Sequence, residues 1–154
     1  MGRVIDIAVD SPRTPGVATL LRMSAEYAES LYPAENCFML DVVELEADDV
    51  TFYLARLDGI VVGTAALVAR DDARAELKRM FVHPDARGAG LARALLDRAE
   101  ADACSTGFRE IVLETGTRHT AAQALYRSHG YRDIPLFGMY IGEEFSVCMA
   151  KTIN

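Results

Sequence analysis

The spacing of hydrophobic positions changes several times along the chain and marks out successive elements. Residues 3–9 alternate between apolar and polar positions, which predicts a short strand. Apolar positions then recur with helical spacing over 17–31, which predicts a helix with Pro15 at its first position. Pro33 ends this helix. The segment 37–47 is ambiguous, and we interpret it as a loop with room for a short helix near its middle.

The rest of the chain predicts a three-stranded meander followed by alternating helices and strands. Asp58-Gly59, between two apolar runs, is a strong signal for a tight hairpin. The predicted elements are strands over 51–57, 60–70 and 74–82, a helix from 88 to 105, a strand over 109–115, a helix over 120–129, and strands over 131–134 and 145–152. This order predicts one α/β domain over 1–154. We expect a mixed, mainly antiparallel sheet of about six to seven strands, with helices on both faces.

The most informative motif lies where the third meander strand ends, at Val82. The segment Arg87-Gly88-Ala89-Gly90-Leu91-Ala92 leads from this strand into a helical pattern. The first N–H groups of a helix lack partners within the helix and lie at the positive end of its dipole. Glycine lets a phosphate approach the backbone closely, and an arginine adds a charged donor. We therefore expect this turn to bind a pyrophosphate.

Two familiar phosphate-binding loops do not fit this turn. A P-loop requires Lys and then Ser or Thr after its last glycine, and here Leu91-Ala92 follows Gly90. The dinucleotide-binding motif requires a third small residue, in a unit that usually opens the domain, and here Arg93 stands at that position after a hairpin. A nucleotide-phosphate binder of another kind stays an alternative, as does a turn with a purely structural role.

Two motifs together resemble the GNAT superfamily of acyl-CoA-dependent N-acyltransferases. The first is the strand that ends at Val82, followed by 87–92 at a helix start. The second is 121–131, AAQALYRSHGY, which resembles the family's helix with Leu-Tyr followed by Gly and an aromatic residue. The motifs have the order and separation found in the family. The similarity extends over nearly the whole chain and is closest in character to a subgroup of small bacterial acetyltransferases.

The resemblance implies acetyl-CoA as the co-substrate and no metal. The pyrophosphate would lie in the 87–92 turn, and the pantetheine arm would follow main-chain groups of Met80, Phe81 and Val82. The strand that ends at Val82 would then splay away from the next strand in the middle of the sheet. A backbone N–H near Met80 or Val82 would polarise the acetyl carbonyl. Where many relatives have an asparagine that contacts pantetheine, this chain has His119.

Amide formation needs a base for the amine and an acid for the leaving thiolate. The resemblance implies that Tyr126 is the acid and contacts the CoA sulfur. Glu76 is the first candidate for the base, because it is expected to share a strand face with Lys78, Met80 and Val82. Some lysine-acetylating relatives also have a glutamate at this position. A surface ion pair is the alternative role of Glu76, and Glu114, near the end of the next strand, is a second candidate base.

The acceptor side is less well defined by the sequence. In the subgroup that the chain resembles, the segments 32–36 and 137–140 line the acceptor cleft. Glu35 could hold a cationic amine and Tyr140 could cover it, or Glu35 could be a solvated loop carboxylate. Glu114 is a further candidate for substrate binding. The sequence does not identify the amine.

Composition narrows the functional classes. The chain has 154 residues, enough for one domain with a core, and a net charge of −7. The negative charge disfavours a duplex nucleic-acid binder and is compatible with a cationic amine substrate. No apolar run is long enough to suggest a membrane span. Three widely spaced cysteines argue against a disulfide framework or a zinc site and favour a reducing cytoplasm.

These observations predict a cytoplasmic N-acetyltransferase that transfers acetyl from acetyl-CoA to the amine of a small molecule or peptide. No cysteine adjoins a histidine or lies in the glycine-containing turn, which favours direct attack in a ternary complex over a covalent acyl-enzyme. The main alternative is a non-catalytic acyl-CoA-binding sensor. Relatives often dimerise, so a homodimer is also an expectation.

Overall fold

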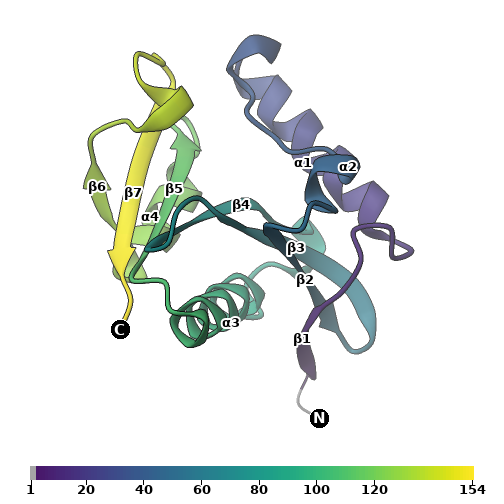
Figure 1. Cartoon of the computed structure of the whole chain (residues 1–154). Coiled ribbons are helices and arrows are strands. Elements are labelled where there is room, and N and C mark those ends of the chain that lie inside the picture. The colour runs from purple at the N-terminus through teal and green to yellow at the C-terminus, as the bar shows by residue number, and fades with distance from the viewer. Residues whose placement is uncertain (1–2) are drawn as a thin grey trace.

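Residues 3–154 form seven strands, four α-helices and three short 3-10 helices in a computed structural model of the chain (Figure 1). The strands are β1 (Ile5–Val9), β2 (Val50–Leu57), β3 (Ile60–Ala69), β4 (Arg74–Val82), β5 (Glu110–Gly116), β6 (Arg132–Ile134) and β7 (Ser146–Thr152). The helices are α1 (Val17–Leu31), α2 (Val42–Leu45), α3 (Leu91–Thr106), α4 (Thr120–Ser128), η1 (Ala34–Asn36), η2 (Pro84–Ala86) and η3 (Gly138–Tyr140). None of the helices in this range has the length and apolar character of a membrane span.

The strands make one sheet in the order β1-β2-β3-β4-β5-β7-β6. Every neighbouring pair is antiparallel except β4 and β5, which are parallel. Strands β2, β3 and β4 form the predicted meander, and α3 provides the crossover that a parallel pair requires. The expectation of a mixed, mainly antiparallel sheet is therefore confirmed.

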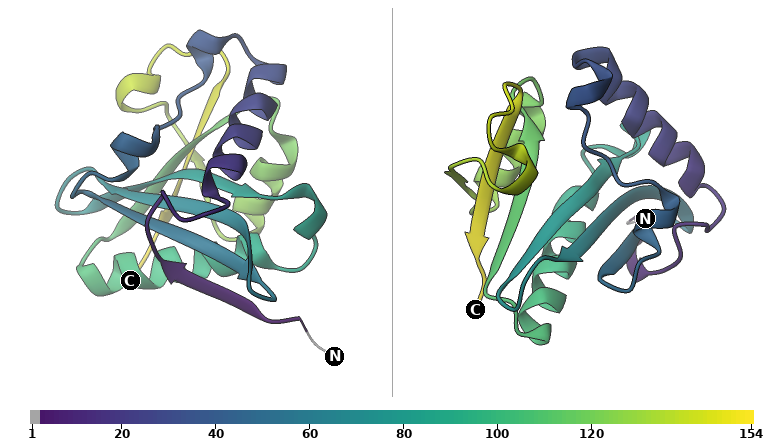
Figure 2. Two further views of the ribbon diagram at one scale, coloured as in Figure 1. Left: turned by 90° about the vertical axis from the view of Figure 1, so that its right-hand side faces the viewer. Right: turned by 45° about the horizontal axis from the view of Figure 1, so that its top comes forward.

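Helices cover both faces of the sheet (Figures 1 and 2). On β2, Tyr53 and Leu57 pack into the core that contains α3, whereas Phe52 and Leu54 pack with α1 and α2 on the other face. This alternation follows the period of two of a strand. The apolar face of α3 is fully buried and consists of Leu91, Leu95, Leu96, Ala99 and Ala103.

Two glycines move the starts of the long helices away from the predicted positions. Gly16 has a φ of 95° and directly precedes α1, so the helix begins at Val17. The prediction that Pro15 is the first helical residue is therefore wrong, and Pro15 lies in the turn before the helix. Gly90 has a φ of 89° and likewise precedes α3, which begins three residues later than expected from position 88. A residue with positive φ does not continue a right-handed helix.

The middle of the sheet is split between β4 and β5. The two strands pair from Arg74 opposite Glu110 to Leu77 opposite Leu113, and no pairing continues beyond Leu77. Figure 1 shows β4 and β5 diverging toward the top of the view. The predicted splay is confirmed, and it leaves one edge of β4 without strand partners over 78–82.

A β-bulge at Arg79 changes which side chains share a face of β4. Arg79 has a φ of 55°, and the register with β3 shifts at this point. Val82 packs in the same core as Leu77, on the α3 side of the sheet, whereas Glu76 does not. The expectation that Glu76 shares a face with Val82 is therefore wrong, because the extra residue of a bulge reverses the alternation that follows it.

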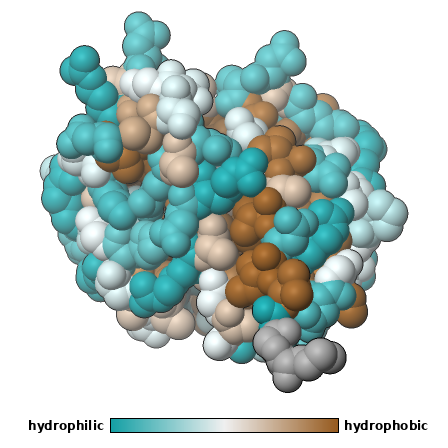
Figure 3. Space-filling view, turned by 90° about the horizontal axis from the view of Figure 1, so that it is seen from below, coloured by the Kyte–Doolittle hydropathy of each residue, from teal (hydrophilic) through white to brown (hydrophobic). Residues whose placement is uncertain are grey.

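Strand β1 forms one edge of the sheet and exposes apolar side chains. Val4, Ile5 and Val9 are exposed there, and Ile60 is exposed where β2 turns into β3. Figure 3, a view from below, shows apolar side chains in brown on the right-hand side of the molecule, where β1 lies in Figure 1. An uncovered edge strand with apolar side chains is a surface on which another chain can pair.

Candidate active site

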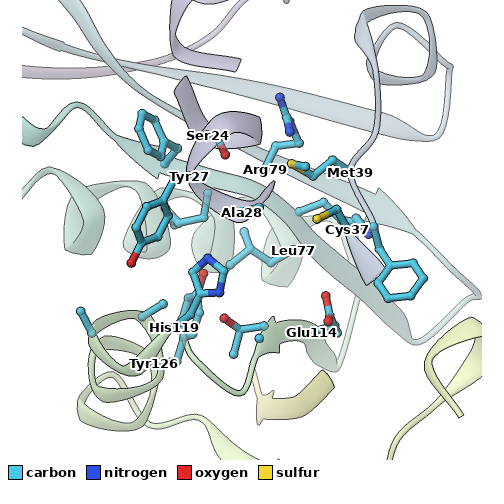
Figure 4. Close-up of a pocket in the computed structure, with 18 of the residues that line it drawn as sticks. Ser24, Tyr27, Ala28, Cys37, Met39, Leu77, Arg79, Glu114, His119 and Tyr126 are labelled. Atoms are coloured by element: carbon cyan, nitrogen blue, oxygen red, sulfur yellow. The ribbon is translucent and has the colours of Figure 1, made fainter. Parts of the chain in front are cut away.

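A cleft of about 360 Å³ opens where β4 and β5 separate (Figure 4). Its walls come from α1, the loop after α1, the unpaired end of β4, the end of β5, and α4. The sequence-predicted site residues that line the cleft are Met80, Phe81, Val82, Arg87, Ala92, Glu114, His119 and Tyr126. These residues are far apart in the sequence, and the splay of the sheet brings them together.

The turn before α3 leaves its main-chain donors free. Within residues 3–154, no hydrogen-bond acceptor serves the backbone N–H groups from Gly88 to Arg93. Gly88 and Gly90 both have positive φ, and a Cβ added to either would meet nothing within 4 Å. Ala89 and Leu91 pack toward the core beneath α3. The turn therefore lies beside the cleft, with open space in front of unpaired donors, which is the geometry that binds an anion.

The Arg87 side chain lies against β4 at the end of the cleft near this turn. Its Nε donates to the carbonyl oxygen of Val82 over 3.3 Å, and its guanidinium lies 5.9 Å from the centroid of the Phe81 ring. Arg87 is exposed and lines the cleft. A charged donor therefore stands between the free N–H groups and the unpaired edge of β4.

Tyr126 lies on α4 with a side chain that is 7% exposed and lines the cleft. Its ring packs edge-on against Tyr131, with the two centroids 5.8 Å apart. Burial raises the pKa of the Tyr126 phenol above its usual value, and the negative charge of Glu114 adds to this shift. Within residues 3–154 its hydroxyl makes no hydrogen bond to another residue, and because this oxygen is not a buried atom it is open to the cleft. A donor that stays protonated at neutral pH is thus available to a ligand in the cleft.

His119 precedes α4 and lines the cleft. Its Nδ1 lies 2.9 Å from the hydroxyl of Tyr32, and that hydroxyl also accepts the backbone N–H of Arg118 over 2.8 Å. Burial lowers the pKa of the imidazole, which favours its neutral form. Gly116 permits this arrangement, because a Cβ there would overlap the Tyr32 ring and lie 2.7 Å from Nδ1 of His119.

Glu114, on β5, is the sequence-predicted carboxylate that lines the cleft. Figure 4 shows its side chain directed into the cleft from the β5 side. The Ser146 hydroxyl donates to Oε2 of Glu114 over 2.8 Å. Burial raises the pKa of the Glu114 carboxyl, while this hydrogen bond and the positive charge of Lys78 oppose the rise. A carboxylate with a raised pKa in a cleft can accept a proton from a ligand.

Glu76 lies beneath the cleft rather than in its wall. It is 2% exposed and accepts hydrogen bonds from the Tyr140 hydroxyl over 2.6 Å and from Nε of Arg70 over 2.8 Å. Lys78, which does line the cleft, donates to the Tyr140 hydroxyl over 2.7 Å. The geometry therefore disagrees with direct contact between Glu76 and an acceptor. It also disagrees with the expectation that Tyr140 covers a bound amine, because Tyr140 is 1% exposed and its hydroxyl accepts a hydrogen bond from Lys78.

The predicted acceptor segments contribute less to the cleft than expected. Glu35 is exposed on η1 and does not line the cleft, so its predicted contact with an amine disagrees with this geometry. The neighbouring Asn36, also on η1, lines the cleft instead. From the segments 32–36 and 137–140, only Tyr32 and Asn36 reach the cleft wall.

Several residues of the cleft wall were not predicted as site residues, and Lys78, Arg79 and Phe145 are among them. Lys78 and Arg79 are consecutive on β4, and strict alternation would direct only one of them to this side. The bulge that brings both there carries no glycine or proline that would mark it in the sequence. Phe145, just before β7, closes the wall near Tyr32, with their ring centroids 5.8 Å apart. A single aromatic residue at the start of a strand, such as Phe145, does not by itself indicate a binding site in the sequence.

Comparison with known proteins identifies the family. Residues 17–131 match the model of the acetyltransferase (GNAT) family. The chain is 38% identical to the IAA acetyltransferase of Azospirillum brasilense over 150 residues, which cover 97% of this chain and 98% of that protein. A solved structure from Klebsiella pneumoniae, named for an acyl-CoA N-acyltransferase, has a TM-score of 0.82 and 28% identity over 98% of this chain and 99% of that one.

A more distant structure shares the same fold. The GNAT family acetyltransferase from Elizabethkingia anophelis, solved with acetyl-CoA bound, has a TM-score of 0.72 and 19% identity, and the match covers 97% of this chain and 98% of that one. The family model covers more than half of the chain, and it includes both motifs that suggested the family, from the turn before α3 to Tyr131. The chain belongs to the GNAT family of acyl-CoA-dependent N-acetyltransferases.

Proposed function

We propose that this chain transfers the acetyl group of acetyl-CoA to the amine of a small molecule or peptide, by direct attack in a ternary complex. The observation that carries the proposal is one continuous path. It runs from the free N–H groups of 88–93, along the unpaired edge of β4, to Glu114 and Tyr126. Family membership supports an acyl-CoA donor, and the relative with bound acetyl-CoA supports acetyl as the group transferred.

The cofactor would occupy this path in three parts. The pyrophosphate would accept hydrogen bonds from the N–H groups of 88–93, with Arg87 turning from β4 to add a charged donor. The amide groups of the pantetheine arm would pair with the free main-chain groups of 80–82, as an added strand would. His119 would donate to the pantetheine arm from the α4 side, in place of the asparagine of many relatives.

The chemistry requires one new bond, one broken bond and two proton movements. The amine reacts in its neutral form: its nitrogen attacks the acetyl carbonyl carbon and gives one proton to Glu114, which later releases it to solvent. The carbon–nitrogen bond forms, the carbon–sulfur bond breaks, and the sulfur leaves as a thiolate. Burial suits Glu114 to this role, because it raises the pKa of the carboxyl toward neutral pH. Glu76 then has a positioning role, since it holds Lys78 at the cleft through Tyr140.

Tyr126 would stabilise the leaving thiolate by donating a hydrogen bond to it. A thiol has a pKa of about 8.5, whereas burial raises the pKa of the Tyr126 phenol above its usual value. Full transfer of the phenolic proton to the thiolate is therefore unfavourable, and solvent completes the protonation of the sulfur. A charge-assisted hydrogen bond still lowers the barrier, because it strengthens as negative charge develops on the sulfur.

The proposal is tested by incubating the purified chain with acetyl-CoA and a panel of amino acids, polyamines, aminoglycosides and peptides. We expect free thiol to appear only with particular amines, and mass spectrometry to detect a product heavier by one acetyl group. Binding of acetyl-CoA without turnover across the panel would favour the non-catalytic sensor instead. Isothermal titration in which ADP or NAD binds far more tightly than CoA would contradict the assigned ligand.

We further propose a cytoplasmic location and a homodimer. Within residues 3–154, the three cysteines Cys37, Cys104 and Cys148 are free thiols, which suits a reducing compartment. The apolar edge at β1, with Val4 and Val9 exposed, is a surface suited to a second copy. Sedimentation equilibrium would test the dimer, and a mass equal to one chain at micromolar concentration would exclude it.

A further inference from the structure

Arg79 is a half-buried cation without an acidic partner. Its Nε is the one buried side-chain nitrogen or oxygen within residues 3–154 that lacks a hydrogen-bond partner. One terminal nitrogen, Nη2, donates to the carbonyl oxygen of Leu21 over 3.1 Å. No carboxylate in the same range lies within 4.0 Å of the guanidinium. Buried charges in proteins are normally paired, and an unsatisfied buried donor is unfavourable.

The backbone at Arg79 is held in an uncommon conformation. Its φ of 55° lies in the left-handed region, which residues other than glycine, asparagine and aspartate rarely adopt. The Thr64 hydroxyl donates to the carbonyl oxygen of Arg79 over 2.8 Å and fixes the bulge from β3. Bulges near active sites commonly redirect a side chain, and strained residues of this kind gather at functional sites.

The bulge directs Arg79 to the end of the cleft away from the thiol site. Arg79 lines the cleft. Figure 4 shows its side chain between Ser24 of α1 and Met39 of the following loop, with Tyr126 on the far side of Leu77. The cofactor path enters from Arg87 and reaches Tyr126, so the end at Arg79 is left for the acceptor.

Lys78 adds a second positive charge to the same wall. It is 9% exposed, and its Nζ is held by the Tyr140 hydroxyl at 2.7 Å and lies 3.8 Å from Oε2 of Glu76. Lys78 also lines the cleft, so its positive charge acts on a ligand there. Two consecutive cations, Lys78 paired with Glu76 and Arg79 without a carboxylate partner, therefore line a cleft in a protein of net charge −7. The net negative charge of the protein would attract cations, but this wall of the cleft is positively charged and would attract an anion.

We propose that the acceptor is an amine that also carries a carboxylate, as an amino acid does, and that Arg79 binds this carboxylate. Lys78 supplies additional positive charge, and the amine faces Glu114. The inference rests on the proposed function, because it names the substrate class of the same site. A guanidinium with free N–H groups matches a carboxylate in charge and in planar geometry. A zwitterionic acceptor also explains why one cleft contains a base and two cations.

The first test uses the unaltered chain. Acetylation rates are compared between the standard L-amino acids and the corresponding L-amino acid amides, which lack only the carboxylate charge. We expect kcat/KM to be roughly ten- to hundredfold higher for the acids that react, as for the loss of one hydrogen-bonded charge pair. The amine of the amide is the less basic of the two, so a larger share of it is already neutral, and this works against the expected result.

The outcomes separate the two proposals. Turnover with equal rates for acid and amide, or a preference for the amide, would overturn the carboxylate site and leave the acetyltransferase function intact. Turnover of aminoglycosides or polyamines alone would do the same. Binding of CoA without turnover of any amine would overturn the proposed function, and this inference with it.

A variant series identifies the residue responsible. In Arg79→Gln, the ratio of kcat/KM between acid and amide should fall toward one, and Arg79→Lys should retain part of it because the charge remains. Arg22→Gln is the matched control, since Arg22 is an exposed cation on α1 that does not line the cleft. If a folded Arg79→Gln variant keeps the same ratio of kcat/KM between acid and amide, another residue recognises the carboxylate. That result would overturn the role of Arg79. If that variant does not fold, the comparison with the unaltered chain still decides the substrate class.

Discussion

The Tyr32 hydroxyl lies 2.9 Å from Nδ1 of His119 and determines which nitrogen of that ring carries the proton. The oxygen of Tyr32 already accepts the N–H of Arg118, so its own proton is free to point at His119. Nδ1 of a neutral His119 then acts as the acceptor, and Nε2 carries the hydrogen. His119 thus offers the cleft an N–H donor, as the side-chain amide of asparagine would in other family members.

Removing this hydroxyl should therefore weaken cofactor binding. Tyr32→Phe leaves the stacked ring in place but no longer selects the tautomer of His119. We expect the Kd for CoA to rise by about three- to tenfold, as for the loss of one hydrogen bond. Isothermal titration measures the change. Tyr27→Phe is the control, because Tyr27 contacts His119 only through its ring, at a centroid distance of 5.3 Å. Equal effects of the two variants would contradict the tautomer argument.

A carboxylate placed in the turn before α3 should abolish cofactor binding. Gly90→Glu would bring a side chain and a negative charge into the open space in front of the free N–H groups. Like charges placed together cost several kcal/mol, so we expect the affinity for CoA to fall by at least roughly a hundredfold.

A matched control separates this effect from backbone strain. Gly59 has a φ of 85°, close to the 89° of Gly90, and a Cβ on either residue would meet nothing within 4 Å. Gly59→Glu introduces the same side chain into the hairpin between β2 and β3, outside the cleft. CoA affinity should change little in this variant. Unaltered CoA affinity in Gly90→Glu would show that the pyrophosphate lies elsewhere.

The sequence was sufficient for the fold and for the elements that flank the turn before α3. The helix α3, the hairpin at Asp58-Gly59 and the glycine-containing turn depend on local signals that the structure retains. The sequence was insufficient where one residue changes the register. The bulge at Arg79 is fixed by the Thr64 hydroxyl of a neighbouring strand, and no local pattern announces that contact. The mistaken face of Glu76 follows from this single tertiary interaction.

The acceptor half was less predictable for a related reason. Glu35 and Asn36 are adjacent and both polar, and only the turn of η1 decides which one faces the cleft. Likewise, Tyr140 reaches Glu76 and Lys78 across more than sixty positions of sequence, and the three side chains form a buried cluster that spacing alone cannot reveal. Long-range packing, rather than local propensity, determines these positions.

Loss of the Tyr126 hydroxyl should lower turnover more than cofactor affinity. In Tyr126→Phe the ring still packs on Tyr131, but no donor meets the leaving sulfur. A hydrogen bond to a charged group is worth about 1.5–3 kcal/mol, which corresponds to a fall in kcat of about ten- to hundredfold. Steady-state kinetics measures kcat, and titration with CoA measures the Kd for the cofactor. Tyr131→Phe is the control, because its hydroxyl bonds Glu100 outside the cleft. Full activity of Tyr126→Phe would remove Tyr126 from the reaction.

The acidic limb of the pH profile should report the ionisation of Glu114. A base must be deprotonated to act, so kcat/KM rises with pH through the pKa of its carboxyl, which burial raises. Glu114→Gln should lower kcat by about a hundredfold or more. Two neighbouring variants should move the limb in opposite directions. Ser146→Ala removes a hydrogen bond that favours the charged form of Glu114, and the limb should shift to higher pH.

Glu143→Gln should shift the acidic limb in the direction opposite to Ser146→Ala. The negative charge of Glu143 raises the pKa of Glu114, so its removal should shift the same limb to lower pH. The pH dependence of the free amine is identical in every profile, and it cancels when the variants are compared with one substrate. Opposite shifts in Ser146→Ala and Glu143→Gln therefore identify Glu114 as the group that titrates. If both profiles coincided with that of the unaltered chain, the base would be another group, and Glu114 would only bind the substrate.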